Sequence, residues 1–194
     1  YSMDGDRAPL ADLIALADRR DAMLILDEAH ATGVYGAGGR GLAAAWEGRP
    51  NIVSLHTCGK ALGAAGALVC LPALLRDFMV NRGRSFIYST APSPLMAATV
   101  RAALKIAESA QQERTQLAAL IGHAGALMRS RLGQAPTGSQ IQPILVGADS
   151  HAVAVAGALQ ARGYDIRAIR PPTVPEGTAR LRIALSLHVG VGML

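Results

Sequence analysis

Continuous apolar runs, rather than alternating apolar and polar residues, mark the strands expected in the first half of the chain. Residues 23–26 (Met-Leu-Ile-Leu) are four apolar residues in a row, which is typical of a short strand buried on both faces of a parallel sheet. Upstream, apolar residues recur at helical spacing over residues 9–19, where Pro9 suits the first turn. A helix that leads into a buried strand is half of a βαβ unit, so the pattern predicts an α/β fold.

The same patterns predict the remaining elements and a division into domains. Residues 133–139 are rich in Gly, Pro, Thr and Ser and indicate a linker. We therefore expect a domain over residues 1–133, with a mostly parallel sheet and a long linking helix, and an incomplete small α/β domain over residues 134–194. Strands are expected over residues 51–55, 67–71, 86–88, 141–146, 166–169 and 180–185, and helices over 72–80, 94–132 with a break near 109–111, and 150–162 with Asp149 or Ser150 as N-cap.

The composition is that of a folded, core-rich protein, with 51% hydrophobic and 17% charged residues. The formal net charge is +5, but the arginines are spread along the chain and aromatic residues are scarce, which argues against nucleic-acid binding. This charge suits an anionic small molecule or an acidic carrier protein.

Cysteine usage and hydropathy favour a cytoplasmic protein. Cys58 and Cys70 lie in apolar sequence without the spacing of a disulfide framework or a metal site, so both are expected to be buried thiols in a reducing compartment. A signal peptide and a membrane span are not apparent, because the apolar run over residues 61–71 is too short to cross a bilayer.

Lys60 is the first candidate for chemistry. It is the one charged residue between Arg49 and Arg76, and Lys105 is the only other lysine in the sequence. An ammonium that is poorly solvated has a lowered pKa and becomes a usable amine nucleophile, as Schiff-base formation with a carbonyl requires. The alternative is a lysine that extends from an apolar surface into water.

Asp27 and His30 directly follow the predicted strand over residues 23–26. Open α/β sheets bind ligands just beyond the carboxyl ends of their strands, so both residues are candidates for ligand contact. A carboxylate that holds the ring proton, together with a Schiff-base lysine, is what pyridoxal phosphate (PLP) requires from a protein. The alternative for Asp27 is a helix cap or a turn former.

With Asp27, His30 and Lys60 in place, the chain resembles the α-oxoamine synthases, a branch of the fold-type-I PLP enzymes. The resemblance implies the aspartate aminotransferase-like fold and pyridoxal 5'-phosphate as cofactor, with no metal. The matching segments occur in family order over nearly the whole chain, at residues 2–6 (Ser-Met-Asp-Gly-Asp), 26–33 (Leu-Asp-Glu-Ala-His-Ala-Thr-Gly), 39–41 (Gly-Arg-Gly), 57–61 (Thr-Cys-Gly-Lys-Ala), 87–90 (Ile-Tyr-Ser-Thr) and 169–182 (Ile-Arg-Pro-Pro-Thr through Ala-Arg-Leu-Arg).

The resemblance also implies roles around the cofactor. Lys60 would form the Schiff base and later move the substrate Cα proton, while Asp27 would pair with the pyridinium nitrogen. His30 and Ser2 would hydrogen-bond near the phenolic oxygen, and Thr57 would lie by the phosphate. For Ser2 and Thr57, simple turn capping is the alternative.

Further residues would bind substrate or serve a second subunit. Family members are homodimers with shared sites, so Ser89 or Thr90 would reach the phosphate of the partner subunit's cofactor. Arg170 would hold a substrate carboxylate, a task that suits its planar fork of donors. Thr173 would line the channel for the acyl substrate. The alternative for Arg170 is a surface arginine beside a Pro-Pro turn.

The motifs are most similar to a member that condenses L-alanine with a pimeloyl thioester, of CoA or of an acyl carrier protein, with loss of CO2, in biotin biosynthesis. This implies a PLP-dependent acyltransferase. One alternative is a member that joins glycine to an acetyl thioester. Another is a non-catalytic interaction module that keeps the fold and has lost the chemistry.

Family members are about twice as long as this chain. We therefore expect a fragment that lacks the N-terminal part, with its phosphate loop and ring-stacking aromatic residue, and also the last helices after Leu187. Such a piece alone is expected to bind PLP poorly and to be inactive.

Overall fold

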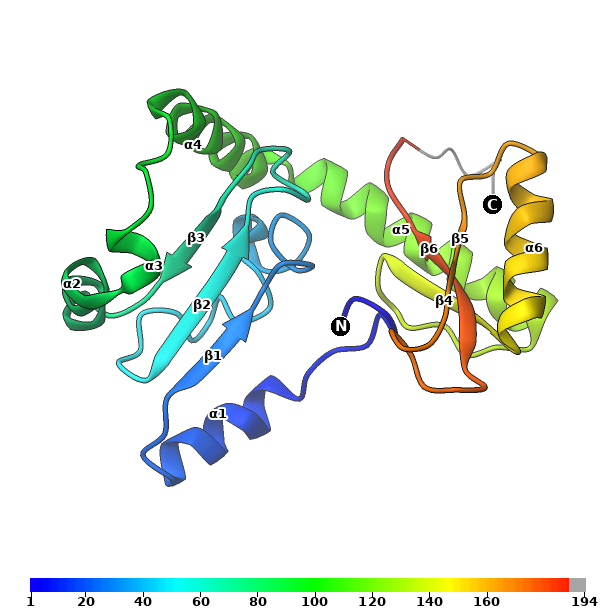
Figure 1. Cartoon of the computed structure of the whole chain (residues 1–194), viewed down its shortest axis with the longest axis horizontal. Helices are drawn as coiled ribbons and strands as arrows, with labels where there is room; N and C mark the ends of the chain where they lie inside the picture. Colours follow the sequence, from blue (N-terminus) through cyan, green and yellow to red (C-terminus); the bar gives the residue numbers. More distant parts are fainter. Residues whose placement is uncertain (189–194) are drawn as a thin grey trace. The chain divides into compact units, whose positions relative to one another are not determined.

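A computed structural model describes residues 1–188 of the chain (Figure 1). The chain forms two compact units, one over Pro9–Arg114 and one that combines Tyr1–Ala8 with residues from Thr115 onward. This division differs from the boundary expected after residue 133, because the long helical stretch begins in one unit and continues in the other. The departure from the family pattern expected after Leu187 falls mainly on residues 189–194, outside the described residues.

The unit over Pro9–Arg114 is built on a three-stranded sheet in the order β1-β2-β3 (Figure 1). β1 and β2 are parallel, whereas β3 returns antiparallel to β2, so only half of this sheet has the parallel pairing that was expected. The elements are α1 (Leu10–Arg19), β1 (Leu24–Asp27), η1 (Ala37–Gly39), β2 (Ile52–Thr57), β3 (Ala67–Cys70), α2 (Ala73–Arg82), α3 (Arg84–Ile87) and α4 (Pro94–Ser109).

The register of β1 against β2 places Asp27 beside Leu55. Because side chains alternate along a strand, every second residue points to the same face of the sheet. On the face that also carries Asp27, Ile25 is 71% exposed, so the expectation that residues 23–26 are buried on both sides is wrong. The covered face packs on α1 and the loop before β2, in a core made of Ile14, Leu26, Ala43 and Ile52, with Leu10, Leu24 and Trp46 against it.

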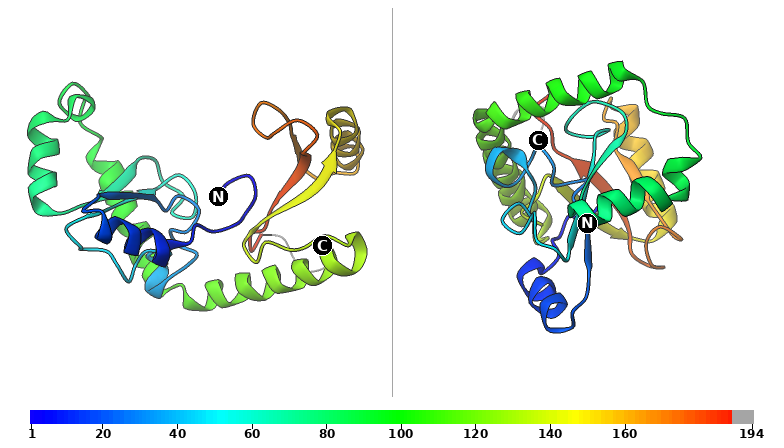
Figure 2. Two further views of the ribbon diagram at one scale, coloured as in Figure 1. Left: turned by 90° about the horizontal axis from the view of Figure 1, so that it is seen from below. Right: turned by 90° about the vertical axis from the view of Figure 1, so that its left-hand side faces the viewer.

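The second unit contains an antiparallel sheet in the order β4-β6-β5, with β6 in the centre. Helix α6 packs against all three strands (Figure 2). Leu120 and Ala124 of α5 pack against Leu185 just after β6. The elements are α5 (Gln111–Leu127), the π-helical turn η2 (Met128–Leu132), β4 (Ile141–Gly147), α6 (Asp149–Ala161), β5 (Arg167–Ile169) and β6 (Ala179–Ala184).

Two local predictions are wrong. Residues 86–88 are not a strand, because α3 covers Arg84–Ile87 and Phe86 is 63% exposed, without a sheet neighbour to bury it. Helix α6 has Ala148 at the N-cap position without a side-chain cap, and Asp149 lies in the first turn, where a negative charge is favourable.

The predicted break in the long helix is confirmed between Ser109 and Gln111. Within residues 1–188, no helix is long and apolar enough to span a membrane.

The N-terminal segment docks on the sheet of the second unit. Arg182 Nε donates to the carbonyl oxygen of Ser2 (2.6 Å), and Arg180 Nη1 donates to Asp4 Oδ1. Directly after Asp4, Gly5 adopts φ +69°, and a Cβ added there would lie 2.1 Å from the carbonyl oxygen of Ile141. Glycine at this position therefore permits both the backbone conformation and the close approach.

Replacing Gly5 by alanine is expected to destabilise the protein more than replacing Gly177, which has a similar φ of +72° but open space around its Cα. Both variants carry the strain of a left-handed alanine, about 1–2 kcal/mol. Only Gly5→Ala adds the collision with Ile141, which we expect to cost about 1–3 kcal/mol more. Urea unfolding of both variants measures the difference, and equal free energies of unfolding would contradict the docking described above.

Candidate active site

The first group of candidate residues lies at the carboxyl ends of β1 and β2. Asp27 ends β1 beside Leu55, and Thr57 ends β2 two residues further on. By the alternation of side chains, Asp27 and Thr57 point to the same side of the sheet as Ile25. We call this side the open face and define it by Ile25, Asp27, Val53, Leu55, Thr57 and Val69.

The two polar groups of the open face are suited to a ligand. Asp27 Oδ1 accepts a hydrogen bond from Ala29 N (2.8 Å), which within the described residues leaves Oδ2 for an incoming donor. Thr57 Oγ1 is buried without a hydrogen-bond partner, the only such side-chain atom within residues 1–188. Because a buried hydroxyl without a partner is costly, a hydrogen bond between this oxygen and a polar ligand would be favourable.

Lys60 lies in the loop that joins β2 to β3. Cys58 and Leu62 of this loop are buried against Val100 of α4, whereas Lys60 itself is exposed. The expectation that its amine is poorly solvated is therefore wrong for the described chain. The apolar residues around Lys60 are small and mostly exposed themselves, and composition alone did not reveal which of them turn inward.

The loop that follows β1 meets the loop that carries Lys60. A Cβ added to Gly33 would lie 2.7 Å from Cβ of Ala61, the residue next to Lys60. His30, in the same loop as Gly33, is half-buried. The pairing of β1 with β2 thus places Asp27 at the carboxyl edge of the sheet, and the loops that carry His30 and Lys60 leave from the same edge.

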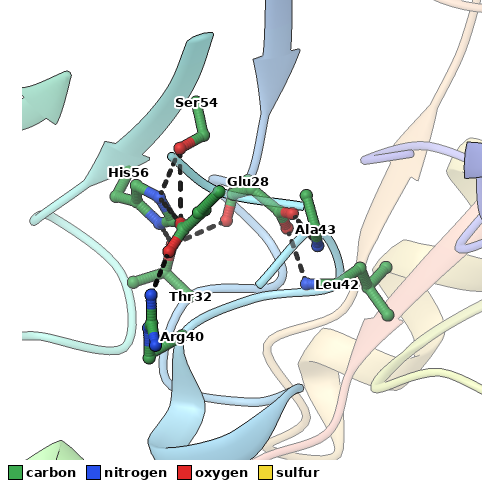
Figure 3. Close-up of polar contacts among 8 residues, drawn as sticks. Glu28, Thr32, Arg40, Leu42, Ala43, Ser54 and His56 are labelled. Atoms are coloured by element: carbon green, nitrogen blue, oxygen red, sulfur yellow. Dashed lines mark hydrogen bonds and ion pairs between the residues drawn. The ribbon is translucent and has the colours of Figure 1, made fainter. Parts of the chain in front are cut away.

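The opposite side of the sheet carries a buried polar cluster that the sequence reading missed (Figure 3). Its members are buried or nearly so except for Arg40, which closes the cluster from the exposed side. The carboxylate of Glu28, which is 4% exposed, accepts hydrogen bonds from Leu42 N (3.1 Å) and Ala43 N (2.5 Å). The remaining side chains are Thr32, Arg40, Glu47, Ser54 and His56.

Ser2 and Thr173, which lie far apart in the sequence, meet in the second unit. They line a pocket of about 450 Å³ together with Asp4, Val174 and Arg180. The guanidinium of Arg180 is almost fully buried. Besides its bond to Asp4, it donates to the Thr178 carbonyl (3.0 Å). The matching segments at residues 2–6 and 169–182 contain Asp4 and Arg180, but their contact could not be inferred from spacing.

Three other candidates lie on exposed loops. Arg170 follows β5, and its carbonyl accepts from Thr173 N (3.0 Å), but its side chain is not among the described groups that line this pocket. Ser89 and Thr90 follow α3 and are both exposed. Ser89 Oγ donates its proton to the Ser85 carbonyl (2.6 Å), which leaves the Thr90 hydroxyl as the better donor for a ligand.

The two cysteines differ. Cys58 is buried as expected, but Cys70 at the end of β3 is exposed, because β3 is an edge strand with one side uncovered. Partial desolvation, and next the negative charge of Glu47, raise the pKa of the Cys70 thiol above its ordinary value. Since the thiolate is the reactive form, Cys70 is not an activated nucleophile.

The fold is that of an α/β protein with polar residues at the carboxyl ends of two parallel strands. The family model described as "Aminotransferase class I and II" matches residues 1–189. The chain belongs to this family.

Comparison with curated proteins narrows the similarity. The chain is 47% identical over 190 residues to the 8-amino-7-oxononanoate synthase of Bordetella petrii, covering 96% of this chain and 48% of that protein. It is 47% identical over 188 residues to the enzyme of the same name from Anaeromyxobacter dehalogenans, covering 96% and 47%. The chain therefore spans about half the length of the curated relatives it matches.

Solved structures show the same similarity in three dimensions. A serine palmitoyltransferase from S. paucimobilis, bound to a PLP–myriocin aldimine, matches with a TM-score of 0.89 and 26% identity, over 100% of this chain and 50% of that chain. The 8-amino-7-oxononanoate synthase of Francisella tularensis matches with a TM-score of 0.80 and 26% identity, over 93% and 54%.

Proposed function

We propose that this chain forms part of an 8-amino-7-oxononanoate synthase, which uses PLP to condense L-alanine with a pimeloyl thioester and releases CO2. The observation that carries the proposal is the pairing of β1 with β2, which sets Asp27 and the unpartnered Thr57 oxygen on one face beside the loop of Lys60. Relatives at 47% identity support the choice of substrates.

The residues of the open face fit the groups of the cofactor. When bound, PLP supplies an electron-withdrawing ring that stabilises negative charge at the Cα of an amino acid. Asp27 offers Oδ2 to the ring N–H, and Thr57 Oγ1 finds in a phosphate oxygen the partner that it lacks. Lys60 would hold the cofactor through its side-chain amine, and the same amine would take the Cα proton of alanine.

The amine of Lys60 requires a less solvated setting than the described chain gives it. Its side chain is exposed, and so are the apolar side chains of Ile25 (71%) and Val69 (52%) on the open face. An apolar sheet face of this kind is normally covered. In our proposal the cofactor and further protein cover it in the complete enzyme, and this cover excludes water from the amine.

The second unit supplies the substrate contacts of the proposal. Arg170 holds a carboxylate of the substrate with its fork of donors. Thr173 lines the path of the acyl chain, and Ser2 hydrogen-bonds near the phenolic oxygen of the cofactor. Ser2 and Thr173 line the same pocket of about 450 Å³, which supports placing both at one substrate site.

A homodimer with shared sites completes the proposal. Ser89 or Thr90 then reaches the phosphate bound by the partner subunit. Thr90 is favoured because the Ser89 proton is already donated to the Ser85 carbonyl. The net charge of +5 suits an anionic acyl donor, either pimeloyl-CoA or the pimeloyl-carrier protein.

Turnover by the intact protein tests the choice of reaction. L-alanine with a pimeloyl thioester, presented on CoA and on carrier protein, is expected to give CO2 and an amino-ketone faster than glycine with acetyl-CoA gives product. The opposite order would assign the chain to a different α-oxoamine synthase. Absence of both reactions in protein that retains bound PLP would favour the non-catalytic module.

Borohydride reduction of the intact protein with bound PLP is expected to fix the cofactor to Lys60, because reduction converts the C=N bond to a stable secondary amine. Peptide mapping by mass spectrometry locates the label. Lys60→Ala is expected to lose the label and all turnover. Lys105→Ala is the matched control, since it removes the other lysine of this chain and should leave both unchanged. A label on another residue would refute the assignment.

Thr57→Val is expected to weaken PLP binding by about tenfold to a hundredfold, because it removes a hydrogen bond to a charged phosphate. The same change should not lower the free energy of unfolding of the cofactor-free protein, because the lost oxygen has no partner there. Thr57→Ser keeps a hydroxyl and should restore binding. Fluorescence titration and urea unfolding measure the two effects, and lower stability with unchanged affinity would contradict this role of Thr57.

A further inference from the structure

His56 is a buried imidazole with a hydrogen-bonding partner at each nitrogen. It is the last residue of β2 before Thr57. Its side chain points to the covered face of the sheet and is 6% exposed. Its Nδ1 lies 2.8 Å from Thr32 Oγ1. Its Nε2 lies 3.1 Å from Glu47 Oε1 and 3.1 Å from Ser54 Oγ.

The Thr32 side of this contact leads to the residues that follow Asp27. Thr32 Oγ1 donates to the carbonyl oxygen of Glu28 (2.8 Å), and Glu28 N donates to the Leu55 carbonyl (2.8 Å), which is the last rung of the β1–β2 ladder. After this rung, the loop backbone forms hydrogen bonds within the loop; for example, Gly33 N donates to the Gly39 carbonyl (2.7 Å). The imidazole of His56 therefore connects the end of β2 to the loop after β1, beyond the last backbone hydrogen bond between the two strands.

The Glu47 side of the contact anchors the imidazole to the loop before β2. Glu47 Oε2 accepts from Arg40 Nη2 (2.7 Å), and Ser54 Oγ donates to Glu47 Oε1 (3.3 Å). Figure 3 shows His56 between Thr32 and Ser54, with Arg40 below them. The ring thus has little freedom to rotate, and the position of Thr32 depends on it.

Thr32 is next to Gly33, which packs against Ala61 with no room for a side chain. Ala61 in turn is next to Lys60. A change in the position of Thr32 is therefore passed to the contact between the loop that follows Asp27 and the loop of Lys60.

We propose that His56 is a positioning residue of the site: through Thr32, its imidazole fixes the spacing between the segment of Asp27 and His30 and the loop of Lys60. The inference rests on the proposed function for what the spacing serves, but the link itself is a property of the cofactor-free protein. Apolar side chains could fill the same volume without a loss of stability, whereas hydrogen bonds specify one geometry.

Thr32→Val tests the link, because it keeps the shape of the side chain and removes the hydroxyl. Thr99→Val is the matched control, since Thr99 Oγ1 makes the same bond to the carbonyl four residues earlier, Leu95 (2.8 Å), on α4. In the intact protein, Thr32→Val is expected to raise the dissociation constant for PLP about tenfold, an effect of about 1.4 kcal/mol. Thr99→Val and the conservative variant Thr32→Ser should stay within about twofold of the parent.

A second variant and a double-mutant cycle separate positioning from stability. His56→Leu is expected to weaken PLP binding as Thr32→Val does, and the double variant to weaken it no further, because both remove the same link. A lower unfolding midpoint with unchanged affinity for PLP in both single variants would overturn the proposal. Failure of both single variants to fold would also overturn it and assign the cluster to stability alone.

Hydrogen exchange of the cofactor-free protein distinguishes this inference from the proposed function. Thr32→Val is expected to speed exchange at the amides of residues 31–33, while Thr99→Val leaves them unchanged. If the parent protein binds no PLP, the proposed function fails, yet faster exchange would still support the link. Unchanged exchange at these amides in a folded Thr32→Val protein would overturn the link itself.

Discussion

The parallel pairing of β1 with β2 is the constraint on which both sides of the candidate site depend. With Asp27 beside Leu55, the open face receives Asp27 and Thr57, and the covered face receives Glu28 and His56. A slip of one residue would bring Asp27 into the core and expose the leucines of β1. The apolar contacts of Leu26 with α1 therefore do more than stabilise the unit, because they also decide which carboxylate faces a ligand.

The polar groups of the two faces differ in whether they have hydrogen-bond partners. This difference distinguishes residues that stabilise the fold from residues that are candidates for ligand contact. On the covered face the carboxylate of Glu28 is fully enclosed and satisfied by two backbone amides. Gly41 makes this possible, since a Cβ there would lie 2.9 Å from the Glu28 carboxyl carbon. A buried charge is tolerable only with such partners. On the open face Thr57 Oγ1 lacks one within the described residues, so a ligand gains a hydrogen bond there without first breaking another.

Patterns in the sequence were sufficient for most elements and for the strand-end position of Asp27, because apolar runs and helical spacing report burial directly. The patterns failed where the burial of a residue depends on which other segment packs against its strand or helix. The run over residues 23–26 has one open side, and Cys70 lies on an edge strand. Phe86, in the strand predicted over residues 86–88, lies exposed in helix α3. The contact of Ser2 with the pocket of Thr173 joins segments at opposite ends of the chain, and no periodicity encodes such a pairing. His56 was not a candidate because it directly follows the strand predicted over residues 51–55, and a single polar residue predicts little until its partners are known.

The exposed amine of Lys60 follows from the same physics as the open face. Condensation with a carbonyl requires an amine that is free to attack, and an apolar setting disfavours the charged form of the group. The cover in the proposed enzyme must therefore exclude water from the loop between β2 and β3, and the exposed Ile25 and Val69 mark where an apolar cover can bind. The buried cluster behind the sheet cannot supply this effect, since it contacts the opposite face. Its contribution is geometric: it holds the loops in place, so that the cover has to provide only the dry surroundings.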